Sequence, residues 1–154
     1  TVNRPLLGDS LEVFRERLYS AKNILYLADN TGETVFDRVF LEALDLPITY
    51  VVKGGPILND ATLVEAIDAG IDKLVPVIET GSRGPGTILE DSTPEFREIF
   101  AKADLVLAKG QANLETLDDQ GEKVFHLLRI KCPLLGELMG YPVGNLVLRQ
   151  AKPL

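Results

Sequence analysis

Residues 24–52 read ILYLADNTGETVFDRVFLEALDLPITYVV, and this stretch decides the fold class. Two apolar runs, ILYLA at 24–28 and ITYVV at 48–52, flank a segment whose apolar residues recur at helical spacing. Because each run is continuous rather than alternating, it is typical of a strand covered on both faces. The stretch therefore predicts a strand, a crossover helix and a second, parallel strand.

The same rhythm continues along the chain. Further strands are predicted at 73–77, 104–108 and 124–130, and further helices at 59–69, 94–103, 111–119 and 132–140. Thr93 followed by Pro94 is a strong helix start, since a hydroxyl caps the helix and proline suits its first position. We expect an α/β fold, a three-layer α/β/α Rossmann-like sandwich with a mainly parallel sheet of about five strands.

Some local expectations can be tested against the structure. The helix at 32–44, capped by Thr31, is expected to turn one apolar stripe to the core. This stripe comprises Val35, Phe36, Val39, Phe40, Ala43 and Leu44. The helix at 59–69 is expected to start at Asn59 and to end at Gly70.

The chain has 154 residues, 45% of them hydrophobic, which predicts a single α/β domain over 1–154. Residues 1–22 hold one amphipathic helix, with Leu11, Phe14 and Leu18 on one face, interpreted as a candidate remnant of a larger helical segment. Residues 23–150 would then form the catalytic core. The loop at 79–91 is the longest irregular piece, and such loops are often functional.

Composition narrows the possible partners. The formal net charge is −7 and there is no Trp, which disfavours nucleic-acid binding. No apolar run of membrane-spanning length and no signal peptide is visible, so no membrane partner and a cytoplasmic location are predicted. The single cysteine, Cys132, excludes an internal disulfide. The oligomeric state is left open.

Polar side chains follow the predicted strands, where ligands bind in open α/β sheets. Asp29 and Asn30 end the first strand, and their oxygens suit Mg²⁺ or Mn²⁺. Asp60 is the best third ligand, although, taken alone, an acid in a first helical turn is better explained by the helix dipole. These three residues predict a divalent-metal site.

Glycines and lysines beside these side chains indicate a phosphate ligand. Gly32 leads the first strand into a helix N-terminus, and Lys53 and Lys109 add positive charge at neighbouring strand ends. The dinucleotide fingerprint and the Walker sequence are both absent. Lys131 is either a third phosphate contact or a solvated lysine, and Arg83 either reaches a second anionic group or faces water.

Four segments together resemble a known family. DNTGE at 29–33, KGGPILNDAT at 53–62, STPEF at 92–96 and AKGQANLETL at 108–117 resemble the metal-dependent damage-control phosphatases, formerly a domain of unknown function numbered 89. The resemblance implies a Rossmann-like sandwich and hydrolysis of phosphomonoesters with Mn, Mg, Co or Ni. It also implies that Asp29, Asn30 and Asp60 bind the metal and that Lys109 contacts the phosphate. Family members usually carry a further, mainly helical segment before this part.

The functional hypothesis is therefore a metal-dependent phosphatase acting on a small phosphorylated metabolite, either a sugar phosphate or a damaged phosphometabolite. Asp29, Asn30, Asp60 and Lys109 are the predicted catalytic residues. The predicted substrate or phosphate contacts are Thr31, Gly32, Glu33, Lys53, Asn59 and Asn113. The nucleophile, water or a carboxylate, is left open.

Two alternatives use the same strand ends. A haloacid-dehalogenase-type phosphotransferase also has an Asp after its first strand, but it needs a second Asp where this chain has Thr31. A non-catalytic domain that binds a phosphorylated metabolite would use the same cleft. His126, inside the last predicted strand, is interpreted as a packed residue rather than a general base.

Overall fold

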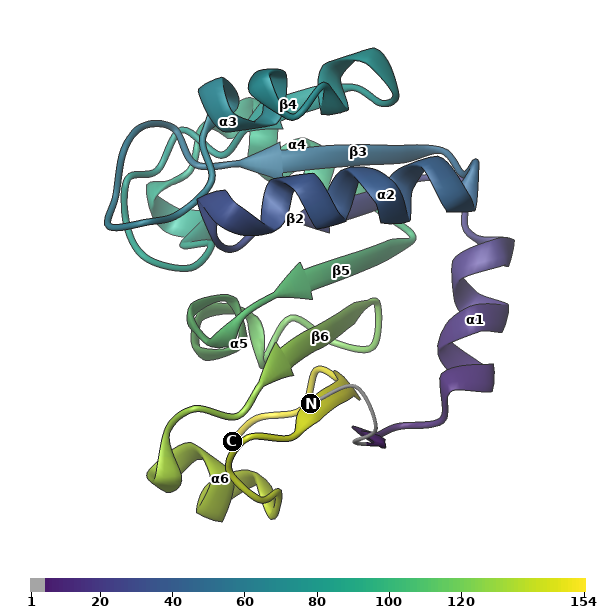
Figure 1. Ribbon diagram of the computed structural model, residues 1–154, viewed down its shortest axis with the longest axis vertical. Helices are drawn as coiled ribbons and strands as arrows, with labels where there is room; N and C mark the ends of the chain where they lie inside the picture. Colours follow the sequence, from purple (N-terminus) through teal and green to yellow (C-terminus); the bar gives the residue numbers. More distant parts are fainter. Residues whose placement is uncertain (1–4) are drawn as a thin grey trace.

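The sheet has seven strands in the order β1-β7-β6-β5-β2-β3-β4, and all neighbouring pairs are parallel except β6 and β7. This computed structural model describes residues 5–154 (Figure 1). The strands are β1 (Leu6–Gly8), β2 (Ile24–Leu27), β3 (Ile48–Val52), β4 (Val77–Glu79), β5 (Leu105–Lys109), β6 (Val124–Arg129) and β7 (Leu146–Gln150). The α-helices are α1 (Leu11–Ser20), α2 (Thr34–Leu44), α3 (Leu63–Asp68), α4 (Pro94–Lys102), α5 (Gln111–Leu117) and α6 (Pro133–Met139).

The predicted α/β class and the mainly parallel sheet are confirmed, but about five strands is too few. β1 and β7 were missed because β1 has only three residues and β7 mixes apolar with charged residues. The strand predicted at 73–77 lies instead at Val77–Glu79, because Ile71–Lys73 forms a 3-10 turn. No helix within residues 5–154 is long and apolar enough to cross a membrane.

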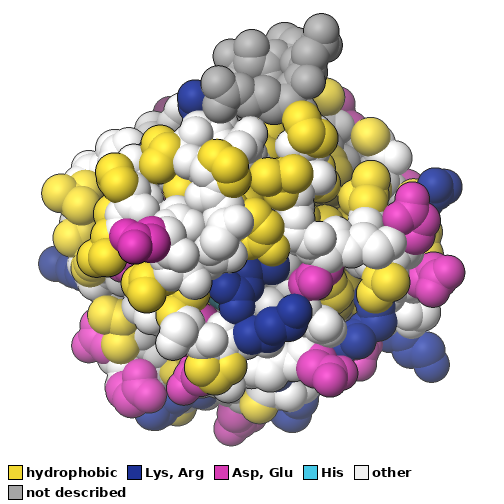
Figure 2. All heavy atoms as spheres, turned by 90° about the horizontal axis from the view of Figure 1, so that it is seen from below, with side chains coloured by type: hydrophobic (Ala, Val, Ile, Leu, Met, Phe, Trp, Pro, Cys, Tyr) yellow, Lys and Arg dark blue, Asp and Glu magenta, His cyan; other side chains and the backbone are white. Residues whose placement is uncertain are grey.

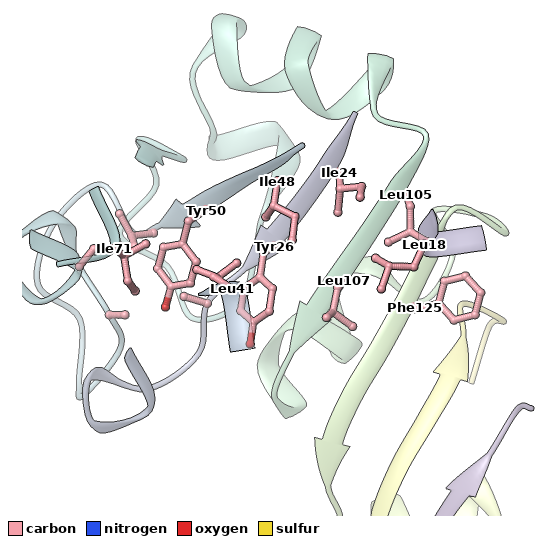
Figure 3. Close-up of a cluster of buried hydrophobic side chains, with 14 of the residues drawn as sticks. Leu18, Ile24, Tyr26, Leu41, Ile48, Tyr50, Ile71, Leu105, Leu107 and Phe125 are labelled. Carbon is pink, nitrogen blue, oxygen red and sulfur yellow. The ribbon is translucent and has the colours of Figure 1, made fainter. Parts of the chain in front are cut away.

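Helices pack on both faces of the sheet. On one face, side chains of α1, α2 and α3 share a core with alternate residues of the central strands, and Figure 3 shows part of it. On the other face, Phe96 and Phe100 of α4 and Leu117 of α5 pack against the intervening residues of β2, β3, β5 and β6. This division follows from the alternation of side chains along a strand.

The predicted apolar stripe of α2 is wrong except at Leu44, which packs partly buried against the core. Phe36 is 76% exposed and Val39 is 62% exposed, whereas Thr34, Asp37 and Leu41 form the buried side. The hydroxyls of Tyr26 and Tyr50 explain the inversion, because they donate hydrogen bonds to the Asp37 carboxylate. Figure 3 shows the two tyrosine side chains in the core. When a buried polar contact orients a helix, the spacing of its apolar residues alone does not predict which face is buried.

Helix starts were predicted with mixed success. Thr93 caps α4 by accepting from the Phe96 N–H, with Pro94 at the first position, as expected. Thr31 and Asn59 do not cap helices. Asn30 precedes a 3-10 turn at Thr31–Glu33, and α3 begins later, after Thr62, which forms a capping box with Glu65.

His126 lies in β6 with no exposed surface, which confirms that it is a packed residue. Neither ring nitrogen has a hydrogen-bond partner within the described residues. The nearby backbone of Leu117 favours the protonated ring, but its effect on the pKa is smaller than that of burial. Burial, with the nearby charge of Arg149, lowers the pKa of His126 to about 4. The folded protein therefore holds a neutral imidazole in its core.

This buried imidazole predicts acid sensitivity. The unfolded state takes up the proton near pH 6.5 and the folded state only near pH 4, so stability falls as the pH drops through that window. At pH 5 the loss from this one group is about 2 kcal/mol. Urea unfolding of the wild type and of His126→Leu at pH 7 and pH 5 tests this, because the variant lacks this part of the pH dependence. Equal pH dependence in the two proteins would contradict it.

Candidate active site

The carboxyl ends of β2, β3, β5 and β6 lie at one edge of the sheet because these strands are parallel. The chain passes from β2 to β3 on one side, while β5 pairs with β2 on the other. The switch point therefore lies between β2 and β5, where α/β proteins bind ligands. Asp29 and Asn30 follow β2 at this point, and Lys109 is the last residue of β5.

Asp60 is brought to Asn30 by backbone pairing, not by a helix. Asn30 and Asp60 form an antiparallel bridge, and the Ala61 N–H donates to the Asp29 carbonyl at 2.8 Å. Thr31 adds two contacts, since its N–H donates to the Asn59 carbonyl at 2.8 Å and its hydroxyl to the Asp60 carbonyl at 3.1 Å. Asp60 thus lies in a loop before α3, which corrects its predicted place in a first helical turn.

The predicted metal ligands form one polar cluster. The side-chain amide of Asn30 makes two contacts: its Nδ2 donates to the Asp29 carboxylate at 2.8 Å, and its Oδ1 accepts from the Asn59 side chain. Burial, with the nearby charges of Glu33 and Asp60, raises the pKa of Asp29 to about 6. Oxygen donors that repel one another in a partly buried site fit a hard divalent cation, which would neutralise them.

The donor set is mixed. Residues 5–154 contain no group of three or more His, Cys, Asp and Glu side chains arranged to hold a metal ion. The predicted set of Asp29, Asn30 and Asp60 has two carboxylates and one amide. To bind the metal, the side-chain amide oxygen of Asn30 would give up the hydrogen bond that it accepts from the Asn59 side chain.

Lys109 is held by two carboxylates. Its Nζ lies 2.7 Å from Glu33 Oε2 and 3.0 Å from Asp37 Oδ1. Burial alone would lower the pKa of Lys109, but the charges of Asp37 and Glu33 outweigh this and raise it. Lys109 therefore stays protonated beside Asp29, with which it lines the same cavity.

Asp37 is the centre of a buried network that the sequence analysis missed. Its carboxylate accepts from Tyr26 Oη at 2.5 Å and from Tyr50 Oη at 2.8 Å, in addition to Lys109. The two tyrosine rings stack, with centroids 5.3 Å apart. An available signal was the recurrence of Thr34, Asp37 and Leu41 at helical spacing, a face that the apolar pattern concealed.

Lys53 faces a different part of the site. It is buried, pairs with Asp60 at 3.5 Å and donates to the Gly86 carbonyl. Burial lowers the pKa of Lys53, and the Asp60 charge partly offsets this. Lys53 thus connects Asp60 to the loop that follows β4.

Asn113 is also a structural link in this structure. It is 2% exposed, and its amide donates to the carbonyls of Lys109 and Ala28 while its oxygen accepts from Thr87. It therefore holds the ends of β2 and β5 to the loop after β4.

The glycine after Lys109 is required by the geometry. Gly110 has a φ of 83°, and a Cβ there would collide with the Asp29 carboxylate. Gly32, in contrast, has open space where a side chain would be.

The surface is not uniformly acidic, although the net charge is −7. Figure 2 shows Lys and Arg side chains gathered near the middle of the face that is seen from below.

Comparisons with known proteins identify the family that this chain resembles. Residues 1–147 match the family model described as the damage-control phosphatase ARMT1-like domain. A damage-control phosphatase of Pyrococcus horikoshii is 41% identical over 151 residues, covering 95% of this chain and 52% of that protein. An uncharacterized protein of Methanocaldococcus jannaschii is 46% identical over 134 residues, covering 82% of this chain and 44% of that protein.

A solved structure shares the fold. The crystal structure of a DUF89-family protein from Pyrococcus horikoshii has a TM-score of 0.91 and 38% identity, and it covers 98% of this chain and 55% of that one. This chain therefore spans about half the length of the relatives it matches.

The network around Asp37 predicts a stability effect. Asp37→Asn removes the buried charge that pairs with partly buried Lys109, and removing one partner of such a pair costs about 3 kcal/mol. Tyr50→Phe removes a single hydrogen bond and keeps the ring, which costs about 1 kcal/mol. Chemical unfolding of both variants measures the difference. Equal, small losses would show that Lys109 does not depend on Asp37.

Proposed function

The chain belongs to the damage-control phosphatase ARMT1-like family, and we propose that it is a divalent-metal-dependent phosphatase that hydrolyses small phosphomonoesters. The observation that carries the proposal is the meeting of Asp29, Asn30 and Asp60 beside Lys109 at the switch point of the sheet. Relatives that bear the name damage-control phosphatase support the same class of reaction.

Asp29, Asn30 and Asp60 would hold the cation, which is Mg²⁺, Mn²⁺, Co²⁺ or Ni²⁺ in this proposal. Such a cation neutralises phosphate charge and lowers the pKa of a bound water. Of these cations, the hard Mg²⁺ and Mn²⁺ suit carboxylate and amide oxygens best, and the borderline Co²⁺ and Ni²⁺ can occupy the same oxygen ligands.

Lys109 is the proposed phosphate contact from the protein side. Its ammonium is kept charged by Asp37 and Glu33, so it can donate to a phosphate oxygen without first gaining a proton. Glu33 is 38% exposed at its side chain, whereas Asp37 is 4% exposed. An incoming phosphate therefore competes with Glu33 for Lys109 and leaves Asp37 in place.

Gly32 and Asn59 complete the proposed phosphate-binding region. Gly32 leaves open space beside the turn, and Asn59 contacts Asn30 at the loop surface. In the overall reaction, water adds to phosphorus, the ester P–O bond breaks, and the leaving alkoxide takes up a proton. The products are an alcohol and inorganic phosphate.

The proposal predicts metal-dependent phosphate release. Metal-stripped protein is expected to release no phosphate from a panel of phosphomonoesters, and added Mg²⁺, Mn²⁺, Co²⁺ or Ni²⁺ is expected to restore turnover. Asp29→Asn and Lys109→Met should each lower kcat/KM by about 100-fold, the loss of about 2.7 kcal/mol of transition-state binding.

Asp68→Asn is the matched control, because Asp68 is an exposed acid on α3 away from the site. It should leave kcat/KM unchanged. Turnover that persists in stripped protein, or a kcat/KM that Asp29→Asn leaves unchanged, would overturn the assigned metal site. Binding of metal and phosphoester without any turnover would instead support the non-catalytic alternative.

A further inference from the structure

A cavity of about 440 Å³ extends from the catalytic residues along the sheet edge. Asp29, Glu33 and Lys109 line one part of it, and Arg129 and Lys131 line another. Its remaining lining residues are Gly110, Gln111, Leu127, Leu128 and Leu146. We call this space the β6 trough.

Strand register places the cations of the trough. Lys109 pairs with Leu127 across β5 and β6, and Arg129 lies two residues further along β6 on the same face. Strand geometry then separates the backbones of Lys109 and Arg129 by roughly 8 Å. Short phosphorylated metabolites have dimensions of this order, so one molecule can reach both residues.

The trough lies on an open part of this face. α2 lies in front of β2 and β3, while the front of β5 and β6 is left uncovered towards their carboxyl ends (Figure 1). α1 packs nearer the start of β6, where Phe14 contacts Phe125. A ligand at the catalytic residues can therefore extend over β6.

Arg129 and Lys131 differ from the other cations of the site. Lys53 and Lys109 are both engaged by carboxylates. Across residues 5–154, no hydrogen bond or ion pair involves the side chain of Arg129 or of Lys131. Both side chains are exposed and remain available to a ligand.

We propose that the β6 trough binds the non-reacting end of the substrate and that this end carries a second anionic group, recognised by Arg129 and Lys131. The inference rests on the proposed phosphatase function. The preferred substrate class is then a short phosphomonoester with a carboxylate or a second phosphate. Leu127 and Leu146 would contact the carbon chain between the two anions.

Matched ester pairs test this assignment. 3-Phosphoglycerate differs from glycerol 3-phosphate by a carboxylate, and fructose 1,6-bisphosphate differs from fructose 1-phosphate by a second phosphate. The wild type is expected to show a lower KM for the doubly anionic member of at least one pair, and the preferred pair distinguishes carboxylate from phosphate.

The double variant Arg129→Ala with Lys131→Ala is expected to raise KM for the doubly anionic ester by about 10-fold or more, since a charge-assisted hydrogen bond contributes about 1.5–3 kcal/mol. For the singly anionic ester, kcat/KM should stay within about twofold, a change below the value of one such bond. Lys102→Ala, an exposed lysine at the end of α4, is the control and should change neither. No preference in the wild type, or equal losses for both esters, would overturn the proposal.

A binding experiment separates this inference from the phosphatase proposal. If the wild type hydrolyses none of the four esters, the proposed function fails, and calorimetric binding of the same pairs decides the role of the trough. Tighter binding of the doubly anionic ester that is lost in the double variant supports the trough. Equal binding of both esters, or tight binding that the double variant retains, overturns it.

Discussion

The carboxylate of Asp37 connects the core of this protein to its candidate active site. It lies beneath α2 and accepts hydrogen bonds from Tyr26 on β2, from Tyr50 on β3 and from Lys109 at the end of β5. Three neighbouring strands and one helix are therefore fixed to one another through a single buried acid. Because a buried charge is costly without partners, each of these contacts supports the others. The core therefore fixes the position of Lys109, the proposed phosphate contact.

The second organising contact lies on the other side of Asp29. The loop at 57–62 runs along the end of β2. Backbone hydrogen bonds bring Asp60 to Asn30, and side chains of Thr31 and Asn59 add hydrogen bonds to the same contact. Lys53 and Asn113 then attach the loop after β4 to the same strand ends. Side chains expected to contact substrate thus hold the loops in place. The residues proposed to face the ligand are Asp29, Asn30, Asp60 and Lys109, with Gly32 and Asn59 in the adjoining turns and the β6 trough beside them.

The exposed side of α2 follows from the same network. Asp37 must face the tyrosines, and the helix therefore turns Val35, Phe36 and Val39 outward. An apolar period predicts the buried face only when the burial of apolar area outweighs every other contact that the helix makes. Here several hydrogen bonds to one carboxylate oppose the hydrophobic preference of that helix. Because these apolar side chains of α2 stay exposed to solvent, they do not contribute the free energy of burial that they would contribute in the core.

The sequence by itself determined the α/β class, the parallel central strands, the start of α4 at Pro94 and the identity of the strand-end residues. These features are local, because they depend on apolar runs, caps and turn residues that lie within a few positions of one another. The tertiary structure alone decided the positions of strands β1 and β7 in the sheet, the buried face of α2, the role of Asp37, and the pairing of Asn30 with Asp60. Each of these depends on contacts between residues far apart in the chain, and such contacts form only when the sheet brings several strand ends together.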